Sequence, residues 1–194
     1  GDYATGPSEG APGYARLWDG LAGLWAPALG PAGNALFDLS GRNNHGVLTN
    51  MDPATDWVGG RDGWALDFGG TNQYVSAGAV LANATAYTIL ISFYYRTTPA
   101  FLGILQQSGG YMGVTSGNKL RFKSKDTNME TSIAANTPYV VAATQTGTVS
   151  SIYLNGVFKI SAADVPRPHV SFTFGSADAT YLLNCVVDWC AAYN

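Results

Sequence analysis

The sequence predicts an all-β protein, a sandwich or a barrel of many short strands, and three observations favour this fold class. Several short runs alternate apolar and polar residues with period two, which is typical of half-buried strands. Glycine is abundant, at 24 residues, and much of it separates these runs. No window of helical length shows a sustained apolar period near 3.6 residues.

The strand candidates follow one another from residue 21 onward. They are residues 21–25, 65–68, 73–76, 87–96, 120–124, 139–146, 151–154, 157–160 and 182–192. Residues 87–96 form the clearest strand, because aromatic and β-branched residues alternate between its two faces. Residues 182–192 are apolar on both faces, which predicts a central strand that is covered on each side.

A hairpin is predicted where Asn155 and Gly156 separate two of these runs. A two-residue hairpin turn needs positive φ at both central residues, and Asn-Gly meets that need better than other pairs. The two runs should therefore pair in one sheet.

The chain divides into an arm and a domain. Residues 1–20 are rich in Gly, Pro, Ala and Ser without a hydrophobic period, so they predict an extended arm. Residues 21–194 are long enough for one well-cored domain. The arm is either an idle linker or a segment that lies on neighbouring subunits, and the sequence leaves both roles open.

Charge and hydropathy exclude several classes of function. Only 12% of residues are charged and the net charge is −3, which predicts neither disorder nor nucleic-acid binding. The densest basic run alternates Lys119, Arg121, Lys123 and Lys125, as on the solvent face of a strand. No segment approaches the ~18 apolar residues that span a membrane.

Two cysteines, Cys185 and Cys190, lie five residues apart near the end of the chain. In a continuous strand this spacing places them on opposite faces, so a bond between them would need a bend. We therefore predict two buried thiols. They leave the redox compartment open.

One segment carries a family resemblance. Residues 38–46 (DLSGRNNHG) resemble the D-x-S-G-x-x-N-H-G signature of laminin-G-like, concanavalin-A-like domains. Other segments are similar to that family in the same order: 23–25, 64–75, 87–93, 152–156 and 187–194. The resemblance implies a laminin-G-like domain over residues 21–194, folded as a two-sheet antiparallel jelly-roll β-sandwich. This fold hosts lectins, glycanases, adhesion modules and viral structural parts, so it does not name a function.

The resemblance implies a structural turn motif and a hairpin. The turn residues are Asp38, Ser40, Gly41, Asn44, His45 and Gly46, and the hairpin residues are Asn155 and Gly156. His45 is either a ligand-contacting residue or part of the turn, and the second is favoured because one histidine does not make a zinc site. No metal or other cofactor is predicted. Calcium remains possible through Asp38 and Asp67, although Gln73 and Asn155 replace acids of the family pattern.

Candidate catalytic groups are sparse, so the sequence predicts that the protein is not an enzyme. Glucanases of this fold use an E-x-D-x-x-E strand, whereas the only glutamates here are Glu9 and Glu130, the second expected in a polar loop. Asp52 and Asp56 are expected to cap turns in a loop. The histidines are His45 and His169, and no G-x-S-x-G occurs.

Carbohydrate binding would use exposed aromatic rings, and Tyr94, Trp57 and Tyr111 are the candidates, with Trp57 expected in a loop. The predicted function is a non-catalytic surface-binding or adhesion module for a glycan or a protein surface. The alternative is a structural protein of an assembly, such as a phage virion decoration or fibre-associated protein. Either role predicts an extracellular, cell-surface or virion-surface location.

Overall fold

The computed structural model describes residues 17–97, 101–107, 110–123, 127–164, 171–175 and 184–194. Most of the predicted arm, residues 1–16, lies outside these ranges, and so do Glu9, Lys125 and His169. The arm's role therefore stays a prediction.

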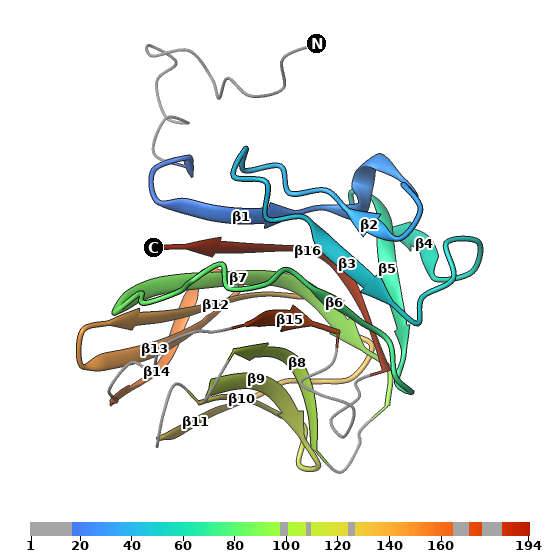
Figure 1. Cartoon of the computed structure of the whole chain (residues 1–194). Coiled ribbons are helices and arrows are strands. Elements are labelled where there is room, and N and C mark those ends of the chain that lie inside the picture. Colours follow the sequence, from blue (N-terminus) through green and yellow to red (C-terminus); the bar gives the residue numbers. More distant parts are fainter. Residues whose placement is uncertain (1–16, 98–100, 108–109, 124–126, 165–170, 176–183) are drawn as a thin grey trace.

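Two antiparallel sheets make up the described part of the chain, each with eight strands there. In spatial order the first sheet contains β14 (Val157–Ala163), β13 (Val149–Leu154), β12 (Tyr139–Thr146), β7 (Ala86–Tyr95), β16 (Asn184–Tyr193), β5 (Gly63–Gly69) and β4 (Trp57–Gly60). Its eighth strand, β1 (Leu21–Trp25), pairs with the second half of β16, and β5 pairs with the first half. Figure 1 shows β1, β16, β7 and β12 following one another.

The second sheet packs against the first. Its order is β11 (Asn128–Ser132), β10 (Lys119–Lys123), β9 (Gly110–Thr115), β8 (Phe101–Gln107), β15 (Phe172–Phe174), β6 (Tyr74–Ser76), β3 (Gly46–Thr49) and β2 (Ala35–Leu36). A short 3-10 helix, η2 (Pro27–Leu29), follows β1. The predicted fold class, an all-β two-sheet antiparallel jelly-roll sandwich, is confirmed.

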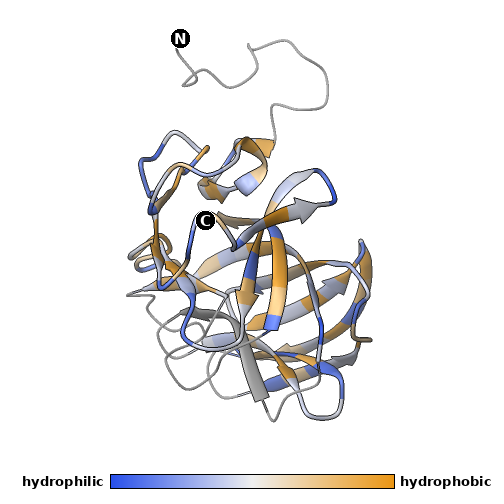
Figure 2. Ribbon diagram, turned by 90° about the vertical axis from the view of Figure 1, so that its right-hand side faces the viewer, coloured by the Kyte–Doolittle hydropathy of each residue, from blue (hydrophilic) through white to orange (hydrophobic). Residues whose placement is uncertain are grey.

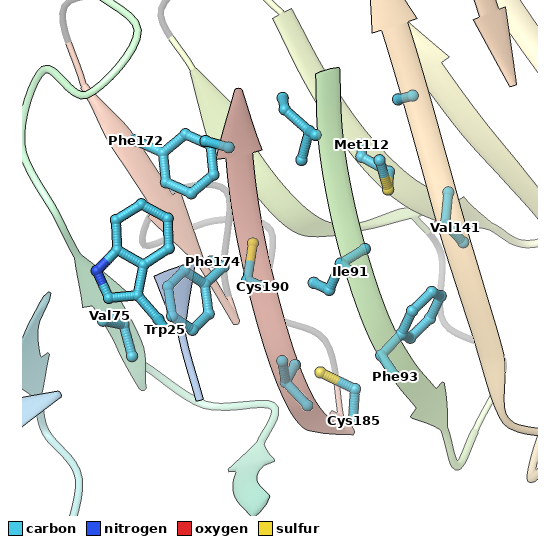
Figure 3. Packing of buried hydrophobic residues seen from close by; sticks show 14 of the residues in the cluster. Trp25, Val75, Ile91, Phe93, Met112, Val141, Phe172, Phe174, Cys185 and Cys190 are labelled. Atoms are coloured by element: carbon cyan, nitrogen blue, oxygen red, sulfur yellow. The ribbon is translucent and has the colours of Figure 1, made fainter. Parts of the chain in front are cut away.

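The core lies between the inner faces of the two sheets. Apolar residues alternate with polar ones along many strands, as the colours of Figure 2 show. The indole of Trp25 is fully buried and stacks on Phe172, with ring centroids 5.1 Å apart (Figure 3). This contact joins β1 of the first sheet to β15 of the second. Burial of such large aromatic rings is a main source of the stability of a core.

A β-bulge at Asp188 puts both cysteines on the core face of β16. The register between β16 and β7 shifts between Val187 and Trp189, so Asp188 is an extra residue. Cys185 and Cys190 consequently both join the core cluster (Figure 3). The opposite faces expected in a continuous strand do not apply, because the bulge inserts a residue that a period-two count does not include. Both thiols are free and buried, as predicted, and this burial raises the pKa of each.

Two further residues lie in strands rather than in the predicted loops. Glu130 is on β11, where its carboxylate accepts a hydrogen bond from Arg121 Nε at 2.7 Å. Trp57 begins β4, and its paired residue on β5 is Leu66. Both strands are short, and neither shows a clear alternation in the sequence.

The hairpin between β13 and β14 turns at Asn155 and Gly156. Their φ values are 49° and 79°, the left-handed conformation that a two-residue hairpin turn requires. The side chain of Asn155 also accepts a hydrogen bond from the backbone N–H of Val140 at 2.8 Å, which ties the turn to β12. Among the described residues, no helix is long and apolar enough to cross a membrane.

Candidate functional site

The turn at residues 38–46 is held by the carboxylate of Asp38, which is 7% exposed. Its Oδ1 accepts hydrogen bonds from the backbone N–H groups of Leu24 and Ser40, both at 2.9 Å. Its Oδ2 accepts from Ser40 Oγ at 2.8 Å and from the backbone N–H of Asn44 at 2.9 Å. One carboxylate thus satisfies four donors and fastens the turn to β1.

His45 is also engaged within this turn. Its Nδ1 accepts a hydrogen bond from the backbone N–H of Asp38 at 3.1 Å, and its ring meets Phe37 edge-on at 5.3 Å. The side chain of Asn44 donates to the carbonyl of Ala22 at 2.8 Å. At Gly46 a Cβ atom would come within 2.5 Å of Val75 Cγ1, so a larger residue does not fit there. These contacts support a structural role for the motif.

Asp67, the second acid considered for calcium, is paired with Arg96. The guanidinium of Arg96 donates to both carboxylate oxygens, at 2.6 and 2.7 Å, and also to Asn184 Oδ1 at 2.9 Å. The hydrogen bond with Asp67 raises the pKa of Arg96. Within the described ranges, no three His, Cys, Asp or Glu side chains gather as a metal site would require.

The three predicted aromatic residues do not meet in one site. Trp57 is 5% exposed and belongs to the core, so its prediction as an exposed platform is wrong. Tyr94 is half-buried on the first sheet, with the guanidinium of Arg96 5.8 Å from its ring centre. Tyr111 is half-buried on the second sheet, opposite Lys123 on β10. The two tyrosines therefore lie on different sheets.

Four hydroxyl side chains line up across the outer face of the first sheet, and we call Thr88, Thr144, Ser151 and Ser161 the hydroxyl row. They are register partners on β7, β12, β13 and β14, the four strands that Figure 1 places side by side. Each is half-buried or exposed, and none has a side-chain hydrogen bond to another described residue. Neighbouring strands lie about 4.8 Å apart, so the hydroxyl groups form a regularly spaced series.

The burial of adjacent residues on the first three strands shows that the row faces outward. Ile89, Ala143 and Ile152 follow or precede the hydroxyl residues and are fully buried in the core cluster. Successive side chains of a strand point to opposite faces, so the hydroxyl groups point away from the core.

An apolar row runs beside the hydroxyl row. It consists of Leu90, Ala142, Tyr153 and Phe158, which are register partners on the same four strands. The rings of Tyr153 and Phe158 meet at 67° with centroids 5.6 Å apart, and Phe158 is 54% exposed. The outer face thus presents aromatic surface next to free hydroxyl groups, which is the combination that carbohydrate sites use.

The hydroxyl row ends in a pocket of about 230 Å³, which we call the end pocket. Tyr193 on β16 is the register partner of Thr88, and both line the pocket together with Tyr87, Gln145 and Asn194. Burial raises the pKa of Tyr193, so its phenol stays protonated and can donate a hydrogen bond at neutral pH.

The wall of the end pocket is fixed by Gln145, which is fully buried. Its Nε2 donates to the carbonyls of Gly147 and Asp164, at 2.9 and 3.2 Å. Its Oε1 accepts a hydrogen bond from Ser150 Oγ. Since its polar atoms are engaged, Gln145 shapes the pocket and leaves ligand contacts to Tyr193, Thr88 and Asn194.

Sequence reasoning missed the hydroxyl row and the end pocket. The strands that carry them were predicted, but a line of hydroxyl groups across four strands depends on register. Single-strand periodicity does not contain that register.

Comparisons with known proteins give structural similarity only. No protein-family model matches the sequence, and no curated protein matches it either. Among solved structures, a Trypanosoma rangeli sialidase mutant that displays trans-sialidase activity is 16% identical, with a TM-score of 0.71 over 90% of this chain. A botulinum neurotoxin type C structure, described by its interaction with two ganglioside molecules, is 15% identical, with a TM-score of 0.66 over 92% of this chain.

A third similar structure is the binding domain of botulinum neurotoxin DC in complex with rat synaptotagmin II, which is 16% identical with a TM-score of 0.65. This chain spans 30% of the length of the sialidase and about half the length of the two toxin chains, at 49% and 48%. At these identities the likeness shows a shared β-sandwich fold.

The prediction that the protein is not an enzyme is contradicted by these comparisons. Sialidases are prominent among the similar structures, at 13–16% identity and TM-scores of 0.61–0.71. The missing glutamate pair argued only against the glucanase mechanism. Sialidases, which are enzymes of another mechanism, contain a similar fold.

Proposed function

We propose that this domain is a carbohydrate-binding module of the laminin-G-like, concanavalin-A-like superfamily, and that its ligand lies on the outer face of the first sheet. The observation that carries the proposal is the hydroxyl row, four hydroxyl groups in register without a side-chain partner among the described residues. Hydroxyl groups both donate and accept hydrogen bonds, as the hydroxyl groups of a sugar do. The adjacent rings of Tyr153 and Phe158 offer apolar surface to the C–H face of a sugar ring.

The similar structures add support from their ligands. One sialidase structure is a complex with sialic acid, and the neurotoxin type C structure concerns ganglioside molecules. The synaptotagmin complex shows that the fold also occurs in a protein-binding domain. We favour carbohydrate because the free groups on this face are hydroxyl groups next to aromatic rings. We also propose that such a module acts outside the cell, at a cell or virion surface.

The proposal is tested by screening the labelled protein on a glycan array and measuring the affinity of the best ligand by calorimetry. A Thr144→Val, Ser151→Ala double variant is expected to bind at least about tenfold more weakly, since each lost hydrogen bond contributes about 1 kcal/mol. The melting temperature should change little, because neither hydroxyl group has a hydrogen-bond partner in the part of the chain that the structure describes.

The matched control is Ser132→Ala on β11 of the second sheet, an exposed serine that should leave the affinity unchanged. An array without any bound glycan would contradict the proposal. So would a double variant that binds as tightly as the wild type.

A further inference from the structure

Building on the proposed function, we infer that the ligand is an uncharged linear oligosaccharide that lies across the strands and inserts its terminal sugar unit into the end pocket. Three features of the outer face support this assignment: the direction of the hydroxyl row, the pocket at one of its ends, and the charge of its four strands, where Lys159 is the one ionised side chain.

The direction of the row defines the length of the ligand. The row crosses four strands perpendicular to their axes, so it extends over about 14 Å. A single sugar unit cannot contact all four hydroxyl groups. A chain of several units can contact them in turn, with Tyr153 and Phe158 beside its path.

The two ends of the row differ. At one end Thr88 belongs both to the row and to the end pocket, where Tyr193 and Asn194 stand next to it. At the other end Ser161 lies on β14, the edge strand of the first sheet. A chain can therefore leave the surface over β14, whereas the end pocket offers a recess for its terminal unit.

The size of the end pocket fits one sugar unit. Its volume of about 230 Å³ is below the roughly 300–1,000 Å³ of pockets for drug-sized ligands. The phenol of Tyr193 and the side chain of Asn194 supply polar groups for the terminal unit. The buried and fully hydrogen-bonded Gln145 keeps the wall in place.

The charge of this face favours a neutral ligand. The four strands contain no acidic residue, and their one basic residue is Lys159, at the bulge of β14 far from the pocket. Arg96, which follows β7, is held by Asp67. Among the described residues, a carboxylated sugar such as sialic acid would find only Lys159, beside the β14 end of the row. The end pocket is lined by no basic side chain, so desolvation of a charge on the terminal unit would be uncompensated there.

Calorimetry with neutral linear oligosaccharides of two to six units tests this inference. Each oligosaccharide is measured in three forms: with both ends free, and with a bulky aromatic label on one end or on the other. Affinity should rise with length up to about four units. One capped end should weaken binding at least about tenfold, while the other cap has little effect. Tyr193→Phe and Tyr193→Ala should weaken binding of the free ligand but not of the ligand capped at the sensitive end.

The Thr144→Val, Ser151→Ala variant separates this inference from the proposed function. If that variant loses affinity while both capped ends and both Tyr193 variants bind normally, the terminal-unit inference is overturned and the module remains. If sialylated oligosaccharides bind and neutral ones do not, the inference of a neutral ligand is overturned. If no oligosaccharide of either kind binds, both the inference and the proposed function fail.

Discussion

Replacing Trp25 with alanine is expected to lower the free energy of unfolding by about 3–5 kcal/mol, because the change leaves a cavity between the two sheets. The indole is fully buried and stacks on Phe172 at 5.1 Å and beside Phe174 at 6.0 Å. Its Nε1 also donates to the carbonyl of Asn44 at 2.8 Å, so the variant leaves that carbonyl without its donor. Urea denaturation followed by circular dichroism measures the loss.

Trp64→Ala is the matched control, since Trp64 is 46% exposed on β5. Its cost should be below about 1 kcal/mol, as for most exposed positions. Equal losses in the two variants would contradict the assignment of Trp25 as the residue that joins β1 to the second sheet.

Asp38→Asn is expected to lower the free energy of unfolding by about 2–3 kcal/mol at neutral pH. The carboxylate accepts four hydrogen bonds, and an amide group in its place turns one acceptor oxygen into a donor. Hydrogen bonds to a charged group contribute about 1.5–3 kcal/mol each, and the backbone N–H of Asn44 is left facing another donor. The same denaturation measurement applies.

Asp62→Asn serves as the control for Asp38→Asn, because Asp62 pairs with Arg61 at the surface, with both side chains more than half exposed. Its cost should stay below about 1 kcal/mol. A melting temperature that rises with added calcium in the wild type, and no longer rises in Asp38→Asn, would argue against the structural role of this carboxylate and for an ion site.

Much of the fold was predictable because the apolar period is strong in the long strands. Residues 21–25 and 139–146 were expected as strands and are strands with these bounds. The Asn155–Gly156 turn was expected because a two-residue hairpin turn needs positive φ at both residues, and this requirement depends only on the local sequence. The short strands β2, β3 and β4 were not expected, because two to four residues show no measurable period.

The bulge at Asp188 shows where pattern reasoning fails. The one visible signal was an acid inside an apolar run, and in the structure its carboxylate accepts hydrogen bonds from Ser92 Oγ at 2.9 Å and the backbone N–H of Arg61 at 3.1 Å. The partner on β4–β5 is distant in the sequence, so nothing local indicated that Asp188 interrupts the alternation. Because of this one inserted residue, Cys190 lies on the core face of β16.

The candidate site was less predictable than the fold. Tyr94 lies on the outer face of β7, where the alternation of that strand placed it, but the hydroxyl row lies further along that face. Thr88 and Ser151 are 63 residues apart in the sequence, and only the pairing of β7 and β13 with β12 places them on either side of Thr144. Trp57 was selected as an aromatic in a loop, whereas burial decided its role.

The location of the ligand on the outer face of the first sheet is tested most directly by an amide ¹H–¹⁵N NMR titration of the protein with the best-binding oligosaccharide. The largest shift changes are expected at Thr88, Thr144 and Ser151 and at their neighbours around the end pocket. Changes confined to the second sheet near Tyr111 and Arg121, or to the turn around Asp38 and His45, would contradict this location.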